Sequence, residues 1–88
     1  MIDGLRTEAP SEPIVTDYDR RHATLYLRLL DAENAETPGE EIARSLLELD
    51  VEADPQGALR MLESHLERAR WMTNVGYRQL LAEGERVG

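Results

Sequence analysis

The chain has 88 residues and a net charge of −8 at pH 7, and 41% of its residues are hydrophobic. This length and composition predict one small folded domain and exclude a wholly disordered chain. The sequence has no cysteine, which excludes disulfides and cysteine-based zinc sites. It contains no apolar run of about 18 residues, and its first residues show neither the basic start nor the apolar run of a secretory signal, so we expect no leader. We therefore expect a cytoplasmic protein.

The first segment, residues 1–15, contains Pro10 and Pro13 and few apolar residues. Prolines and low apolar content argue against regular structure, so we expect a flexible N-terminal arm. Its last two residues, Ile14 and Val15, are expected to pack onto the domain as a hydrophobic staple.

The helical domain is expected over residues 16–83, with residues 84–88 as a C-terminal tail. The first helix is predicted to begin with Thr16 or Asp17 as N-cap and to run to about Asn34. A stripe of residues recurs at helical spacing: Tyr18, His22, Leu25, Tyr26 and Leu29, widened by Leu27 and Leu30.

A second helix is predicted to start after Thr37 as N-cap, with proline next and Glu40 completing a capping box, and to end near Leu49. Residues 50–54 form the connection, and Asp54 followed by proline marks the third helix. This turn is longer than the three or four residues typical of a helix-turn-helix. The fold class is therefore all-α, a small three- to four-helix domain containing a helix-turn-helix with a lengthened turn.

The third helix is predicted over residues 55–73, followed by a short last helix over residues 77–83. One broad arc of the third helix is apolar and should face the core: Ala58, Leu59, Met61, Leu62, His65, Leu66, Ala69 and Met72. The opposite side carries charged and polar residues and one tryptophan: Arg60, Glu63, Ser64, Glu67, Arg68, Arg70 and Trp71.

No enzymatic constellation is found in the sequence. His22 and His65 fall on different helices without a second ligand at one-turn spacing, so we expect no metal site. His65, on the apolar arc, is interpreted as a core residue bonded through one ring nitrogen. Neither a phosphate-binding loop nor a nucleophile with a base occurs, and we expect no catalysis and no cofactor.

The helix-turn-helix plan raises the question of DNA binding. Residues 37–54 carry a net charge of −5, and DNA affinity comes largely from cationic side chains that neutralise phosphates. We therefore expect the chain not to bind DNA on its own. The alternative is a transcriptional regulator that contacts DNA directly through the third helix.

Trp71 fits two placements: packed against a neighbouring helix, or exposed beside arginines one turn apart. Tyr26 and Tyr77 share the same alternatives. Exposed aromatic and arginine side chains are enriched at protein interfaces. The second placement predicts a partner-binding surface of six residues: Tyr26, Arg60, Ser64, Arg68, Trp71 and Tyr77.

The chain resembles the domain of unknown function 2285 in three parts: Tyr18–Asp31, Glu41–Arg44, and Ser64–Thr73 together with Gly76–Leu81. This is a helix-turn-helix family found in regulators carried on mobile elements. In that family activators carry a second domain, whereas short stand-alone members act as quorum-sensing antiactivators. The resemblance implies an antiactivator that restrains transfer of an integrative and conjugative element. Its expected partners are a two-domain activator of the same family and a LuxR-type regulator.

Overall fold

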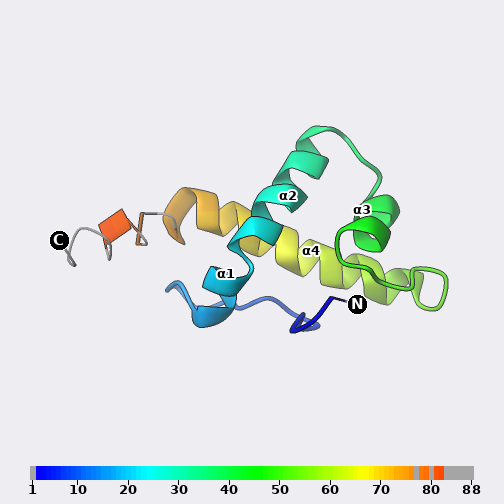
Figure 1. The fold of residues 1–88 in the computed structure, drawn as a ribbon, viewed down its shortest axis with the longest axis horizontal. Coiled ribbons are helices and arrows are strands. Elements are labelled where there is room, and N and C mark those ends of the chain that lie inside the picture. The colour runs from blue at the N-terminus through cyan, green and yellow to red at the C-terminus, as the bar shows by residue number, and fades with distance from the viewer. Residues whose placement is uncertain (1, 77, 80, 83–88) are drawn as a thin grey trace.

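The computed structural model describes residues 2–76, 78, 79, 81 and 82. The described part is helical and contains no strand, which confirms the all-α fold class. Figure 1 shows α2 crossing α4, with α3 packed near the start of α4. The elements, in chain order, are α1 (Asp17–Arg21), α2 (Ala23–Asn34), α3 (Gly39–Ser45), α4 (Pro55–Trp71) and the π-helical turn η1 (Met72–Gly76).

The single first helix predicted from the sequence is divided at His22, whose φ of −108° and ψ of 14° lie outside the helical range. The imidazole Nδ1 and the backbone N–H of His22 both bond to the Tyr18 carbonyl. The start was predicted correctly, because Thr16 caps α1 and forms a capping box with Asp19.

The helix α3 is shorter than predicted and starts differently. Its N-cap is Pro38 without a side-chain cap bond, so the predicted Thr37 capping box is wrong; the backbone N–H of Thr37 instead donates to the Ala32 carbonyl. The helix ends at Ser45, and Glu48 adopts a φ of 54° in the left-handed region. The connection to α4 therefore spans residues 46–54 and is longer still than the sequence predicts.

The helix α4 starts as predicted, since the Asp54 side chain accepts a hydrogen bond of 3.0 Å from the backbone N–H of Gly57. It ends at Trp71, earlier than expected, and continues into η1. The predicted apolar arc is confirmed, with Leu59 half-buried and its other members buried. The predicted last helix, residues 77–83, includes Tyr77, Leu80 and Glu83, which lie outside the described residues.

Three helices contribute to one core, which α4 organises. Leu29 of α2, Ala43 of α3 and Ala69 of α4 are fully buried, and so is Leu47 from the connection after α3. The helices α2, α3 and α4 thus pack as one three-helix unit, in which α3, the connection and α4 follow in the order of a helix-turn-helix. No helix in the described part is both long and apolar enough to cross a membrane.

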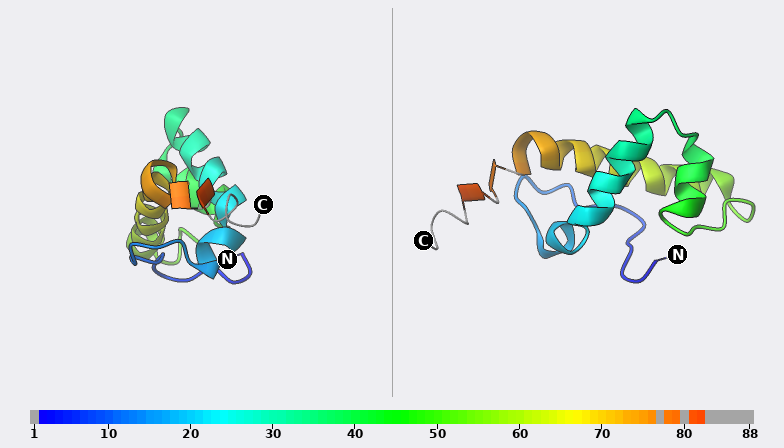
Figure 2. Two further views of the ribbon diagram at one scale, coloured as in Figure 1. Left: turned by 90° about the vertical axis from the view of Figure 1, so that its left-hand side faces the viewer. Right: turned by 45° about the horizontal axis from the view of Figure 1, so that its top comes forward.

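Residues 2–15 lie against α4 and α1, where the sequence predicts a flexible arm (Figure 2). Leu5 and Val15 are buried at its two ends, whereas Ile14 is 59% exposed, so only Val15 packs as the expected staple does. Between these ends the backbone N–H of Ala9 donates to the Ser64 hydroxyl at 2.8 Å. Side chains of α4 thus provide partners that the composition of residues 1–15 does not reveal.

Candidate nucleic-acid interface

The exposed surface of α4 begins in its first turn. Gln56 and Arg60 are exposed and one turn apart, and within the described residues their side chains form no hydrogen bond or ion pair. Glu63 and Glu67 continue the exposed side further along the helix. The N-terminal half of α4 therefore offers an amide and a guanidinium to solvent, and the following turns offer carboxylates.

The connection before α4 is acidic and also exposed. Asp50, Glu52 and Asp54 lie on the surface at this end of the molecule. Glu52 is ion-paired with Arg44 of α3 across 2.8 Å, and Asp54 is occupied as the cap of α4. Asp50 accepts a hydrogen bond of 3.2 Å from the backbone N–H of Ala53, so all three carboxylates already have partners within the protein.

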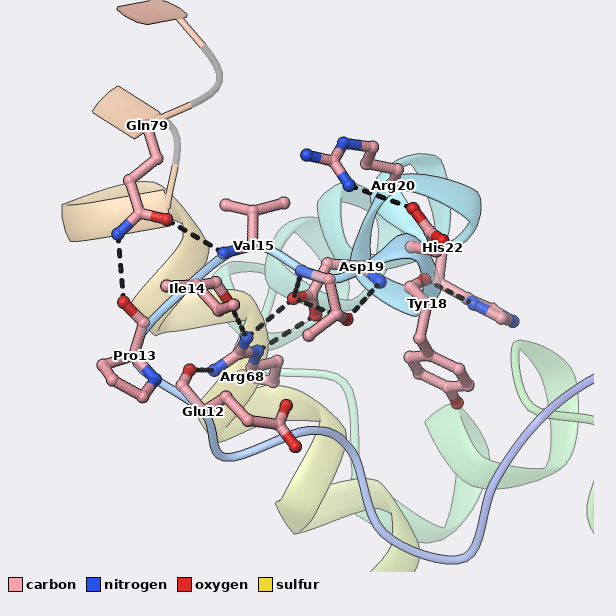
Figure 3. Close-up of polar contacts among 12 residues, drawn as sticks. Glu12, Pro13, Ile14, Val15, Tyr18, Asp19, Arg20, His22, Arg68 and Gln79 are labelled. Carbon is pink, nitrogen blue, oxygen red and sulfur yellow. Dashed lines mark hydrogen bonds and ion pairs between the residues drawn. The ribbon is translucent and has the colours of Figure 1, made fainter. Parts of the chain in front are cut away.

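Behind the exposed face, a buried ion pair fixes the orientation of α4 (Figure 3). The guanidinium of Arg68 is 4% exposed, and its Nε and Nη2 donate to the two carboxylate oxygens of Asp19 at 3.0 and 2.7 Å. Asp19 is fully buried and also accepts a hydrogen bond from the Tyr26 hydroxyl at 2.9 Å. The pair joins α1, α2 and α4 through one set of charge-assisted hydrogen bonds.

The same arginine also holds the N-terminal segment. Its Nη1 donates to the Glu12 carbonyl and its Nη2 to the Ile14 carbonyl, each at 2.8 Å. Gln79 adds two bonds on the far side, donating to the Pro13 carbonyl and accepting from the Val15 N–H (Figure 3). Arg68 therefore has donors directed both into the core and toward the segment that covers it.

Burial alone would raise the pKa of the Asp19 carboxyl, but hydrogen bonds from Arg68, Thr16 and Tyr26 outweigh it and hold the pKa below the ordinary value. Burial, together with the hydrogen bond to the Asp19 carboxylate, raises the pKa of Tyr26 far above its usual range. Asp19 is therefore ionised and Tyr26 neutral at physiological pH, as the hydrogen-bond directions require.

A second buried polar pair lies beside the first. The ring of His65 donates from Nδ1 to the Met61 carbonyl and accepts from the Tyr18 hydroxyl at Nε2, both at 2.7 Å. Because a carbonyl only accepts, this tautomer is the one that satisfies both bonds. The sequence predicted a core histidine bonded through one nitrogen; the structure shows a fully buried one bonded through both.

The buried His65 and Asp19 side chains should make the domain lose stability in two steps as the pH falls. Burial lowers the pKa of His65 below 6.5, so below that pH the unfolded chain binds a proton that the folded protein excludes, and stability falls. Asp19 adds a second loss below its ordinary pKa of 3.8. Denaturant midpoints measured between about pH 7.5 and 5.5 should fall in the wild type and fall less in His65→Gln. An equal fall in both, with His22→Gln as the control, would contradict this assignment.

An open groove runs between α4 and the N-terminal segment. Its walls come from Thr7–Ser11 on one side and from the exposed residues of α4 on the other, including Arg60, Glu63 and Glu67. Residues of the acidic connection close one end, and Trp71 lies at the other. The groove therefore includes the outward face of α4 itself.

The six predicted partner-binding residues do not form one surface. Tyr26 and Arg68 are buried and have no surface to offer a partner, because both bond to Asp19. Arg60 is exposed, whereas Ser64 and Trp71 are half-buried. The Arg68 guanidinium carbon lies 3.8 Å from the centroid of the Trp71 ring. Tyr77 lies outside the described residues. Partner binding by these six residues stays a prediction. Among those that the structure describes, only Arg60, Ser64 and Trp71 have side chains that reach the surface.

The sequence reasoning missed the pairing of Asp19 with Arg68. Helical periodicity placed Arg68 on the outer side of α4, because it treats a charged residue as solvent-facing. A local signal did exist: the pattern Thr16 to Asp19 is a capping box. That pattern predicts a positioned carboxylate, but nothing local identifies a partner 49 residues away.

A family model described as "RovC_DNA-bd: T6SS, Transcription factor, DNA binding domain" matches residues 3–82. No curated protein matches the chain significantly. The family match overturns the expectation that the chain does not bind DNA. That expectation counted charge along residues 37–54, whereas DNA contacts a surface, and the structure places an exposed glutamine and arginine on the first turns of α4. The match supports the prediction of a small domain from a transcription regulator. It does not test the resemblance to the domain of unknown function 2285, which stays a prediction.

Proposed function

Since this chain belongs to the family of T6SS transcription factor DNA-binding domains, we propose that it binds double-stranded DNA as part of a transcription regulator, with α4 entering the major groove. The observation that carries the proposal is the exposed start of α4 within a matched DNA-binding domain. Transcription regulation is thereby the general role. An antiactivator role, quorum sensing and conjugative transfer have no support from the match.

The size and position of α4 suit this role. Its 17 residues extend over roughly 25 Å at about 1.5 Å per residue, and a major groove about 12 Å wide admits one helix. In helix-turn-helix proteins the N-terminal residues of the recognition helix contact base edges. In this chain those residues include Gln56 and Arg60, which are exposed and one turn apart.

Both side chains suit base recognition. A glutamine amide pairs with adenine through two hydrogen bonds, and an arginine guanidinium does the same with guanine. Arg44 on α3 can add a phosphate contact by exchanging its exposed partner Glu52, since exposed ion pairs contribute little stability. The interface thus combines two base-reading side chains with few cationic contacts to the backbone.

The acidic surface sets the expected binding mode. Few phosphate contacts mean weak non-specific affinity and a shallow dependence on salt, with log K falling by roughly 2–3 for a tenfold rise in salt concentration. Specific binding then depends on the base contacts of α4. We therefore expect the chain to select a sequence from a random duplex pool but to bind unselected DNA poorly.

The test is titration of a selected duplex, followed by fluorescence anisotropy at low salt. Arg60→Ala should weaken binding by about tenfold or more, because one bidentate base contact is worth about 1–3 kcal/mol. Arg28→Ala is the matched control, since Arg28 is an exposed arginine on α2 and its loss changes the net charge equally. Failure to enrich any duplex at low salt, or equal losses for the two variants, would refute the proposal.

A further inference from the structure

The N-terminal segment is fastened to the helix that we propose as the DNA reader. Ala9 bonds to Ser64 at 2.8 Å, and Arg68 bonds to the carbonyls of Glu12 and Ile14. Ser64 and Arg68 are the next two turns of α4 after Arg60 on the same side of the helix. The segment therefore borders the face that contains the proposed base-reading arginine.

This segment brings negative charge to that face. Glu8 and Glu12 are exposed, and residues 7–16 contain no basic side chain. Thr7 and Glu8 line the same groove as Arg60. Carboxylates at this position repel phosphates that approach α4, and the backbone of the segment limits how deeply α4 enters a groove.

The middle of the segment is held more weakly than its ends. Leu5 and Val15 are buried in the core. Between them Pro10 is buried and Ala9 half-buried, whereas the other residues from Thr7 to Ile14 are exposed. Residues 7–14 contain no helix or strand, and their contacts with α4 include three side-chain hydrogen bonds. The middle can therefore lift while both ends remain anchored, because Pro10 is the one buried residue of this stretch and few other contacts oppose local opening.

Lifting would also change the surface of α4. Arg68 would keep both bonds to Asp19 through Nε and Nη2, but its Nη1 would lose the Glu12 carbonyl. That N–H would then be available to a phosphate. Release thus removes two carboxylates from the DNA-facing side and uncovers one cationic donor.

From these contacts we propose that residues 7–14 are an autoinhibitory strap that competes with DNA for the exposed face of α4. This proposal rests on the proposed function and adds two states to it. The strap is closed on α4 without DNA, and it is lifted between Leu5 and Val15 when DNA is bound to α4. Its inhibition is electrostatic through Glu8 and Glu12 and steric through the backbone.

The charge test compares two double variants with the same net charge. Glu8→Gln with Glu12→Gln neutralises the strap, and Asp31→Asn with Glu36→Gln neutralises two exposed residues at the far end of α2 and just beyond it. The strap variant should bind the selected duplex about fivefold more tightly than wild type, since an exposed charge contact is worth up to about 1 kcal/mol. The control pair should change the affinity less than twofold at the same salt concentration, roughly within the spread of exposed pairs.

The structural test is amide hydrogen exchange with and without the duplex. The Ala9 N–H, which donates to Ser64, should exchange faster when DNA is bound, while core amides of α2 keep their protection. Suppose that wild type binds DNA, but the affinity of the strap variant rises no more than that of the control, or the Ala9 N–H becomes more protected. The strap proposal is then wrong, and the proposed function stands. If no variant binds any duplex, both proposals fail, because the strap then has nothing to inhibit.

Discussion

Replacing Arg68 with alanine is expected to destabilise the domain by about 3–5 kcal/mol, because it leaves a buried carboxylate without its charge partner. Asp19 is 0% exposed, and two of its hydrogen bonds come from Arg68. The same change removes the bonds that hold the Glu12 and Ile14 carbonyls. Urea unfolding followed by circular dichroism measures the loss, and Arg60→Ala on the exposed side should change stability by less than about 0.5 kcal/mol.

A double-mutant cycle separates the ion pair from simple packing. Asp19→Asn combined with Arg68→Met removes both charges, so the double variant should be more stable than the sum of the single losses indicates. Strict additivity would mean that the two side chains do not interact energetically. A loss of less than about 1 kcal/mol for Arg68→Ala would contradict the burial of this pair.

Replacing Leu47 with alanine is expected to cost about 2–5 kcal/mol, the range for a leucine that leaves a cavity in a packed core. Leu47 is 0% exposed although it lies in the connection between α3 and α4 and not in a helix. Its carbonyl also accepts a hydrogen bond from the Ile2 N–H at 3.3 Å. The lengthened turn is therefore a structural part of the core.

Leu27→Ala is the matched control for this change, because Leu27 is 60% exposed on α2. The same chemical substitution there should alter the unfolding free energy by less than about 0.5 kcal/mol. Thermal unfolding of both variants on one preparation gives the comparison. Similar losses at the two positions would show that the connection is not packed as described.

Helical periodicity and caps were sufficient to predict most of the architecture. Asp54 before a proline located the start of α4, and the apolar arc from Ala58 to Met72 identified the core face of that helix. Both signals are local, since a cap satisfies backbone donors of its own helix and an arc follows from the helical repeat. The cap and the apolar arc can therefore be recognised without knowledge of tertiary contacts.

Features that depend on distant residues were missed. Nothing near Arg68 shows that Asp19 neutralises it, and nothing within residues 1–15 shows that Ser64 accepts a bond from Ala9. The premature end of α3 was missed as well: Glu48 adopts a φ of 54°, and the Leu49 N–H donates to the Ala43 carbonyl at 3.1 Å, as in a helix-ending turn. Contacts between residues far apart in the chain thus decide the roles of Arg68 and of residues 1–15.

The prediction from net charge that the chain does not bind DNA was wrong for a related reason. A sum over residues 37–54 treats every carboxylate as facing DNA, yet the structure pairs Glu52 with Arg44 and uses Asp54 as a cap. The side chains expected to read bases, Gln56 and Arg60, lie just beyond that window. Net charge predicts the strength of non-specific attraction, and it does not predict which helix meets a groove.

The most direct test of DNA binding through α4 is to map backbone amide shifts while a selected duplex is added to isotope-labelled protein. If the proposed function is right, the largest changes in amide shift should occur in the first turns of α4, from Gln56 to Ser64. Smaller changes should occur at Arg44 of α3. The outer side of α2 around Leu27 and Arg28 should be unaffected. Shifts confined to α2, or none at low salt, would contradict the assignment of α4 as the DNA-reading helix.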